Sequence, residues 1–349
     1  MPYESDGFDE NAMRVFLGLA VDGSGHAVWH SFPVTIWREA DGASVESMTQ
    51  PSVVTIGNFD GVHLGHRHVL ARARGLAGSL RAESPLPVVA VTFDPHPLEV
   101  IAPDHAPRRL STLHQRISLL RAAGADFVYV LAFSKEMSAW TPQEFVQRVL
   151  VNELHAAGVV IGENFRFGHR AAGDIDFLRA AGEKYGFAVD GLNLDGGEVP
   201  HSSTLVRSLV AEGDVARAAE ILGHPHTVEG VVVKGDQRGR ELGFPTANMP
   251  ADPDVAVPAD GVYAGWVIRA GGDRLPAAIS VGANPTFVGV QRRIESYVLD
   301  RTDLELYGES ISVEFVGRLR GQVRFTGVDD LIATVADDVS RTRTVLGIG

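Results

Sequence analysis

The chain has 349 residues, of which 45% are hydrophobic and 21% are charged, and its formal net charge is −13. This length favours two domains, and the composition is that of an ordinary globular protein. A chain without cysteine excludes disulfides, thiolate metal sites and cysteine nucleophiles. Because nonspecific nucleic-acid binding needs a broad basic surface, the acidic balance argues against a nucleic-acid partner. No apolar run reaches membrane-spanning length, so we predict a cytoplasmic protein without a membrane partner and leave its oligomeric state open.

Residues 1–49 are the least regular part of the chain. The segments FLGLAV and VTIW could form short strands, but polar and glycine-containing stretches surround them. We expect a leader of uncertain structure, with Val34 as a candidate true start if its codon is GTG. A native protein whose mass begins at Met1 would contradict that start.

A strand followed by a helix opens the regular part of the chain. Val53, Val54 and Ile56 form an apolar, β-branched run that predicts a buried strand. From Val69 to Leu80, apolar residues recur at the spacing of one helical face. The strand therefore passes into a helix across GNFDGVHLGH, residues 57–66.

That turn suits a polyphosphate, because glycines let backbone approach a ligand and free amides at a helix start favour an anion. His63 and His66 lie three residues apart, which would place both imidazoles on one side of a first helical turn. Two other interpretations compete: surface histidines before an amphipathic helix, and a zinc site that adds His68. Neither cysteine nor an HExxH motif accompanies these histidines, which disfavours zinc.

The next segments alternate between strand and helix patterns. Strands are expected at 87–94, 126–133 and 158–162, and a helix at 111–124 would begin with Ser111 or Thr112 as its N-cap. Another helix would begin at Thr141, with Glu144 completing a capping box. This alternation predicts a doubly wound, Rossmann-like α/β domain.

Two later segments carry donors for phosphate. GENFRFGHRAAGD follows the strand at 158–162 and contains Arg166 and Arg170, although a plain surface loop would look the same. HSSTLVRSL places hydroxyls at a helix start, with Arg207 one turn later. Ser203 could be a simple N-cap, or it could join a phosphate clamp.

GNFDGVHLGH, TFDPHP, GENFRFG and SSTLVR, in this order, resemble the FMN adenylyltransferase module of bacterial bifunctional riboflavin kinase/FAD synthetases. The first of them matches the nucleotidylyltransferase signature GxFDxxHxGH. His201 departs from the family, which usually has isoleucine there. The resemblance implies catalytic roles for His63, His66 and Arg207. It implies nucleotide binding by Gly57, Phe59, Asp60, Gly65, Asn164, Ser203 and Thr204.

From His226 onward the pattern changes to short β-branched runs separated by glycine-rich turns. This pattern predicts a small antiparallel barrel, followed by an amphipathic helix at 328–346. We therefore divide the chain into residues 50–225 and residues 226–349, joined by the helical connector VAEGDVARAAEILGHP.

The loop GDQRGRELGFPTAN is the informative part of the second domain. Its glycines suit backbone freedom and close ligand approach, and the oxygens of Thr246 and Asn248 suit Mg²⁺. With GVYAGW, SVGANPTF, IESYVLD and LYGESI it resembles the riboflavin kinase module. The resemblance implies an ATP and flavin loop made of Gly235, Gly239, Arg240, Gly243, Phe244, Pro245, Thr246 and Asn248, the last two holding Mg²⁺.

Glu295 is the catalytic base that the resemblance implies. Strand alternation places it on one face with Tyr297, opposite Ile294, Ser296 and Val298. Alternation does not say which face points inward, and the resemblance led us to expect Glu295 inside, in a partly apolar site.

The resemblance covers about residues 50–346 and implies two activities. They are phosphorylation of riboflavin to FMN by ATP with Mg²⁺, and adenylyl transfer from ATP to FMN, which gives FAD and pyrophosphate. One alternative is an adenylyltransferase or cytidylyltransferase for a non-flavin phosphate with an inactive barrel. The other is a flavin- or RNA-binding regulatory protein.

Overall fold

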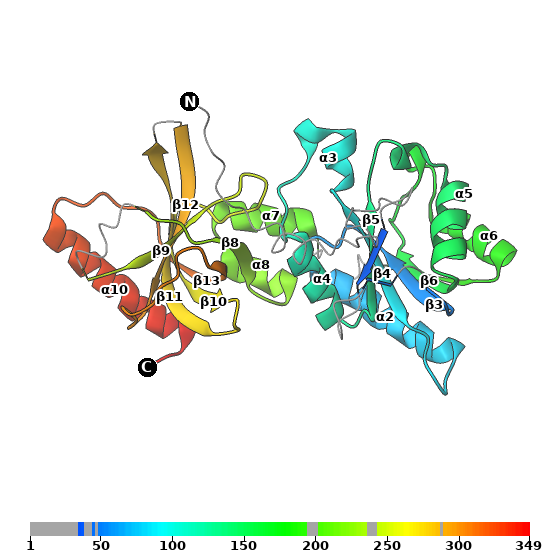
Figure 1. Ribbon diagram of the computed structural model, residues 1–349, viewed down its shortest axis with the longest axis horizontal. Coiled ribbons are helices and arrows are strands. Elements are labelled where there is room, and N and C mark those ends of the chain that lie inside the picture. Colours follow the sequence, from blue (N-terminus) through cyan, green and yellow to red (C-terminus); the bar gives the residue numbers. More distant parts are fainter. Residues whose placement is uncertain (1–33, 38–43, 46–47, 194–201, 236–242, 287–288) are drawn as a thin grey trace, which may run out of the picture. The chain divides into compact units, whose positions relative to one another are not determined.

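The computed structural model describes residues 34–37, 44–45, 48–193, 202–235, 243–286 and 289–349 (Figure 1). The chain divides into two compact units. The first holds the chain up to Phe59, His66–Ala106 and Ile117–Asp195, and the second holds Asp60–Gly65, Pro107–Arg116 and Gly196–Gly349. The FLGLAV segment, Gly239, Arg240 and His201 lie outside the described residues. Within the described part, no helix is long and apolar enough to span a bilayer.

The first unit is built on a seven-stranded sheet with the order β2-β1-β5-β4-β3-β6-β7. Strands β3 to β7 run parallel, whereas β1 pairs antiparallel with β5 and β2 pairs antiparallel with β1. The bounds are Val34–Trp37 (β1), Ser44–Val45 (β2), Ser52–Ile56 (β3), Val88–Asp94 (β4), Phe127–Ala132 (β5), Ala156–Gly162 (β6) and Ala188–Leu192 (β7). The segment predicted as a leader therefore supplies two strands of the sheet, β2 at the edge and β1, formed by VTIW, between β2 and β5.

Helices accompany the parallel strands, as the alternation predicts. Thr112 caps its helix by accepting from the Gln115 amide, and Thr141 and Glu144 form the expected capping box. The helices are α2 (Leu64–Leu80), α3 (Pro97–Ile101), α4 (Leu113–Ala122), α5 (Pro142–Phe145), its π-helical continuation η3 (Val146–Glu153) and α6 (Ile175–Tyr185). Short 3₁₀ turns lie at η1 (Pro103–His105), η2 (Met137–Ala139) and η4 (His169–Ala171).

The order of the parallel strands reverses between β3 and β6, which are neighbours in the sheet. The chain leaves β3 toward β4 on one side, and β6 lies on the other. In open α/β sheets ligands bind at such a switch point, beyond the carboxyl ends of the strands. GNFDGVHLGH follows β3 and GENFRFG follows β6, so both motifs begin at this edge.

The second unit is a six-stranded antiparallel sheet with the order β8-β13-β10-β11-β12-β9. The Val233 amide, just after β8, donates to the Asn248 carbonyl in β9 at 2.8 Å and so links the two edges into a barrel. The bounds are His226–Val231 (β8), Thr246–Pro250 (β9), Gly261–Arg269 (β10), Arg274–Thr286 (β11), Gly289–Val298 (β12) and Ser310–Arg320 (β13). Residues 246–248 of β9 belong to the segment predicted as a loop, GDQRGRELGFPTAN. In the structure β9 is a strand because β12 supplies it with a paired edge.

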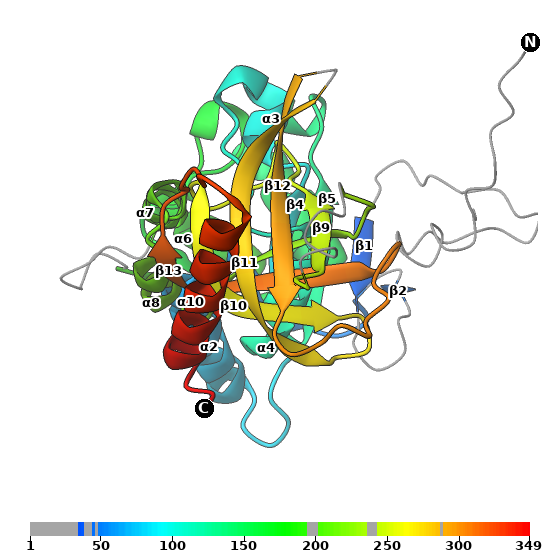
Figure 2. The ribbon, with the colours of Figure 1, turned by 90° about the vertical axis from the view of Figure 1, so that its left-hand side faces the viewer.

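Among the described residues, α7, α8 and α10 lie wholly within this unit. The C-terminal helix α10 (Val328–Leu346) lies against β10, β11 and β13 (Figure 2). Helix α7 (Ser203–Glu212) follows the predicted helix start in HSSTLVRSL, and α8 (Val215–Leu222) lies within the predicted connector. They end at Gly213 and Gly223, both in the left-handed conformation. Val215 of α8 is fully buried in the barrel core.

Candidate active sites

The turn after β3 has an unusual backbone. Phe59, Gly61 and Val62 have φ values of 49°, 77° and 41°. A positive φ is uncommon for a residue with a side chain and rarest for a β-branched one such as valine. Such conformations persist only where the surrounding structure enforces them, and they concentrate at functional sites. Phe59 is buried, and its ring meets that of His66 edge-on at a centroid separation of 5.1 Å.

Two of the three glycines of this turn, Gly57 and Gly61, are held by contacts within the fold itself. The Gly57 amide donates to the Val91 carbonyl in the sheet, and a Cβ at Gly57 would lie 3.3 Å from the Phe59 ring. A Cβ at Gly61 would lie 3.1 Å from the side chains of Leu110 and Leu222. Packing therefore explains both residues, independently of the predicted approach of a ligand.

The two histidines differ in setting. Helix α2 begins at Leu64, so His63 stands one residue before it, whereas His66 lies in its first turn. The His63 side chain is buried and that of His66 is half-buried. Gly65 is buried in the same turn.

The Asp60 side chain accepts several hydrogen bonds, and it is 3% exposed. Its carboxylate accepts from the Leu110 amide at 2.9 Å, the Ser111 amide at 3.0 Å and the Ser111 hydroxyl at 3.1 Å. Its Oδ2 also accepts from the Arg207 guanidinium at 2.6 Å. Three segments distant in sequence meet at this one side chain.

The start of α7 differs from the prediction in one respect. Ser202 is the N-cap, because its side chain accepts from the Leu205 amide. Ser203 is the first helical residue, and its hydroxyl donates to the Asp60 carbonyl at 2.9 Å. Thr204 is exposed. Arg207 follows one turn later and donates through Nε to the Arg108 carbonyl at 2.7 Å.

The segment after β6 combines a packed and an exposed set of side chains. Phe165 and Phe167 stack at 5.8 Å and pack on the core of the first unit. Asn164, Arg166 and Arg170 are exposed. The aromatic residues thus anchor the loop, which leaves its polar side chains at the surface.

In the barrel, β9 and β12 bring the predicted kinase residues onto one face. Glu295 pairs in register with Asn248, and Tyr297 pairs with Thr246. The expected inward position of Glu295 is wrong. Ile294, Ser296 and Val298 are buried on the core side, and Glu295 lies half-buried on the opposite face. Uncharged residues face the apolar barrel interior, because burying a carboxylate there would cost desolvation free energy.

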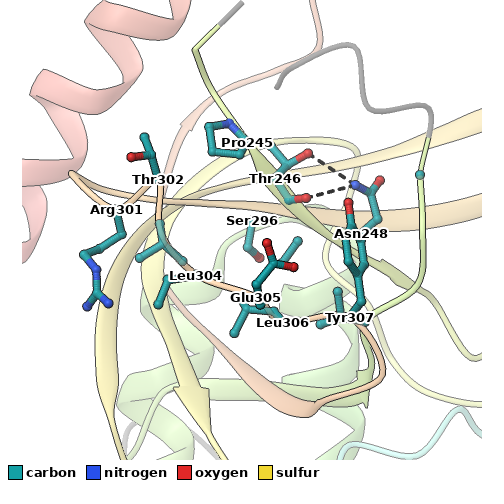
Figure 3. Close-up of a pocket in the computed structure, with 14 residues that line it drawn as sticks. Pro245, Thr246, Asn248, Ser296, Arg301, Thr302, Leu304, Glu305, Leu306 and Tyr307 are labelled. Atoms are coloured by element: carbon teal, nitrogen blue, oxygen red, sulfur yellow. Dashed lines mark hydrogen bonds between the residues drawn. The ribbon is translucent and has the colours of Figure 1, made fainter. Parts of the chain in front are cut away.

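A cavity is lined on the β12 side by Ser296 and Val298, the residues that face away from Glu295 (Figure 3). Thr246 and Asn248 line it, and the Asn248 amide donates to the backbone and hydroxyl oxygens of Thr246, both at 3.2 Å. Glu305 also lines it, with its carboxylate pointing inward, whereas Glu295 is not among the lining residues. Glu305 is not among the predicted site residues, although it directly precedes the LYGESI motif.

The rest of the predicted kinase loop divides into parts with different physical roles. A Cβ at Gly235 would lie 2.6 Å from Cγ of Asn248, whereas Gly243 has a φ of 86° and open space around it. Pro245 lines the cavity, and the Phe244 ring meets that of Tyr297 at 5.4 Å.

Comparisons with known proteins agree with both halves of this description. The family model described as FAD synthetase matches residues 45–204, and the model described as riboflavin kinase matches residues 222–346. A bifunctional riboflavin kinase/FMN adenylyltransferase of Escherichia coli K12 is 40% identical over 298 residues, which cover 85% of this chain and 93% of the relative. The chain belongs to this bifunctional family.

Other members and one solved structure extend the likeness. The riboflavin kinase/FMN adenylyltransferase of Listeria monocytogenes is 35% identical over 295 residues, covering 83% of this chain and 91% of that enzyme. A crystal structure from Streptococcus pneumoniae, described as a macrolide-efflux protein, is 31% identical with a TM-score of 0.76, covering 85% of this chain and 95% of that one. The predicted family and the two-part fold are confirmed.

Proposed function

We propose that this member of the family makes FAD from riboflavin in two steps, with the barrel acting as the kinase and the α/β domain as the adenylyltransferase. The observation that carries the kinase assignment is the register that sets Glu295 beside Asn248 on one face of β12 and β9. The adenylyltransferase assignment is supported by the position of GNFDGVHLGH at the switch point of the parallel sheet.

In the kinase step, Glu295 accepts the proton of the riboflavin 5′-hydroxyl as that oxygen attacks the γ-phosphate of ATP. The new bond joins the flavin oxygen to the γ-phosphorus, and the bond to the β-phosphate oxygen breaks, which leaves FMN and ADP. A half-buried carboxylate suits this role, because it is shielded from water and still reachable by substrate.

Thr246 and Asn248 are the residues that would hold Mg²⁺. Their oxygens are hard ligands, and the Glu305 carboxylate lines the same cavity, which is the donor chemistry that Mg²⁺ prefers. When bound, the ion would offset negative charge on the ATP phosphates.

In the second step, the FMN phosphate attacks the α-phosphate of another ATP and pyrophosphate leaves. This nucleophile is already ionised, so the chain needs to supply positioning and positive charge and no strong base. We assign those roles to His63, His66 and Arg207, with nucleotide contacts from Gly57, Phe59, Gly65, Asn164, Ser203 and Thr204. For the kinase, the ATP and flavin contacts include Gly239 and Arg240. We further propose that the enzyme works in the cytoplasm on small-molecule substrates and without nucleic acid.

One assay tests the function and its division between the halves. Riboflavin, ATP and Mg²⁺ are incubated with the protein, and riboflavin, FMN and FAD are separated by chromatography. We expect FMN first and FAD after it. No conversion by folded protein would contradict the proposal.

Two variants then test the assigned residues. Glu295→Gln should lower FMN formation by about 10²- to 10⁴-fold, the usual worth of a general base, and spare FAD formation from supplied FMN. His66→Asn should lower FAD formation from supplied FMN by about 10²-fold or more and spare FMN formation from riboflavin. If either variant affected both reactions equally, the division of labour would be wrong.

A further inference from the structure

Asp60 was predicted to contact the nucleotide, but the structure leaves its carboxylate little capacity to do so. A carboxylate offers about four lone-pair positions. Asp60 already receives four donors: two backbone amides, one hydroxyl and one guanidinium. At 3% exposure it is also out of reach of a bulky ligand.

The contacts of Arg207 are equally specific. Its Nη2 binds Asp60 and its Nε binds the Arg108 carbonyl, so the plane of the guanidinium is held at two points. Its Nη1 donates no hydrogen bond to any described residue. A guanidinium fixed in this way presents its remaining edge in one direction, with little conformational entropy left to lose when an anion binds.

We infer that Asp60 is a positioning residue that orients Arg207 toward the phosphates of the adenylyl-transfer reaction. This inference rests on the proposed function. It replaces a direct nucleotide contact by Asp60 with an indirect one, made through Arg207. The Ser203 hydroxyl, which donates to the Asp60 carbonyl, ties the first turn of α7 to the same point.

The chain contains a matched control for this ion pair. Arg320 and Asp338 in the barrel unit are also 2.6 Å apart, with side chains 17% and 4% exposed, against 18% and 4% for Arg207 and Asp60. Asp338→Asn therefore removes a charge from an equally buried pair that has no assigned role in either reaction. The structural effect of losing the ion pair itself should be similar in Asp60→Asn and Asp338→Asn, and the Asp60 contacts with Leu110 and Ser111 are tested separately by the Arg207→Ala background.

The test is a double-mutant cycle on FAD formation from supplied FMN and ATP, with FMN formation from riboflavin measured in every variant as a check on folding. Asp60→Asn should lower kcat for adenylyl transfer by about 100-fold, the cost of misplacing a catalytic group, with a smaller change in KM for ATP. Asp338→Asn should leave adenylyl transfer unchanged. In an Arg207→Ala background, adding Asp60→Asn should cost nothing further, because Asp60 acts only through Arg207.

Chemical rescue by guanidinium distinguishes positioning of Arg207 by Asp60 from a purely structural role of Asp60. Guanidinium added to Arg207→Ala should restore part of the adenylyl transfer, because Asp60 still offers it a binding site. The same addition should fail with the double variant Asp60→Asn/Arg207→Ala. Multiplicative losses in the cycle, or equal rescue of both proteins, would overturn the inference.

If Asp60→Asn does not fold and loses both activities, Arg207→Lys decides the question. Lysine keeps the positive charge beside Asp60 but lacks the planar fork. We expect a loss similar to that of Arg207→Ala, and full activity would show that orientation by Asp60 is unnecessary. Failure of the wild-type protein to make FAD would instead refute the proposed function.

Discussion

Gly235 and Gly243 belong to one predicted loop, but each is a glycine for a different physical reason. Gly243 adopts a left-handed backbone that disfavours other residues, whereas no positive φ is found at Gly235. Gly235 is glycine because Cγ, Nδ2 and Oδ1 of Asn248 lie 2.6–2.7 Å from where its Cβ would stand. In the sequence both residues are glycines of one predicted loop, and nothing there distinguishes their roles.

We predict that Gly235→Ala displaces the Asn248 side chain from Thr246. The two hydrogen bonds between these residues would be lost, so kcat/KM for riboflavin phosphorylation should fall about tenfold, and more Mg²⁺ should be needed for half-maximal rate. Kinase rates measured across a Mg²⁺ titration check this. FAD formation from FMN should not change. If Gly235→Ala were just as harmful in an Asn248→Ala background, Asn248 would not be the cause.

At the scale of elements, strand β9 shows tertiary pairing overriding local preference. Pro245 precedes β9 and Pro250 ends it, and asparagine disfavours strands. Local preference in the sequence therefore predicts a turn. Pairing with β12 makes β9 a strand and thereby sets Thr246 and Asn248 on one face.

Strand β8 is held at its first residue, His226, which is 1% exposed. Its Nε2 donates to the Ala256 carbonyl at 2.7 Å, and its ring stacks on Phe315 of the neighbouring strand β13. Burial lowers the pKa of His226 to about 4, against a smaller rise caused by the Ala256 hydrogen bond. The ring is therefore neutral in the folded barrel at neutral pH.

We predict that this histidine makes the barrel acid-sensitive. With a folded pKa of about 4 and an unfolded value of 6.5, the unfolded chain binds the extra proton as pH falls below 6.5. Through this group alone, the free energy of unfolding should fall by about 2 kcal/mol between pH 7 and pH 5. Glutamine at position 226 keeps a hydrogen-bond donor but does not titrate. The free energy of unfolding of the His226→Gln variant should therefore fall less between pH 7 and pH 5.

The measurement is urea unfolding of the barrel followed by the fluorescence of Trp266. Trp29, Trp37 and Trp140 are replaced by phenylalanine in the proteins with histidine and with glutamine at position 226. The tryptophan fluorescence then comes from the barrel alone. Equal pH dependence with histidine and with glutamine at position 226 would contradict the predicted titration.

At the scale of the whole molecule, the second compact unit begins well before the barrel strands. We placed the second domain at residue 226, yet the unit includes α7 and α8, and Val215 of α8 is part of the barrel core. Residues 60–65 and 107–116 also belong to it, including Leu110, which packs with Leu209 and Leu222. The motif GNFDGVHLGH therefore contributes residues to both units.

We predict that a fragment of residues 202–349 is more stable than one of residues 226–349. The shorter fragment loses Val215 from the core and the α8 surface from β8 and β13, which should cost about 2–4 kcal/mol. Urea unfolding of the two fragments, both of which lack residues 60–65 and 107–116, checks this. Equal unfolding free energies would mean that the barrel strands form a complete core by themselves.

The sequence alone determined the alternation of strands and helices, the capping of α4 and α5, the two-part fold and the family. These features depend on periodicity and on motifs within short stretches, so each can be recognised locally. Only the tertiary structure decided that β9 is a strand, that Glu295 lies outside the barrel core, and that the Asp60 carboxylate, predicted to bind nucleotide, binds Arg207. Asp60 and Arg207 are 147 positions apart, and such a contact exists only once the chain has brought its distant segments together.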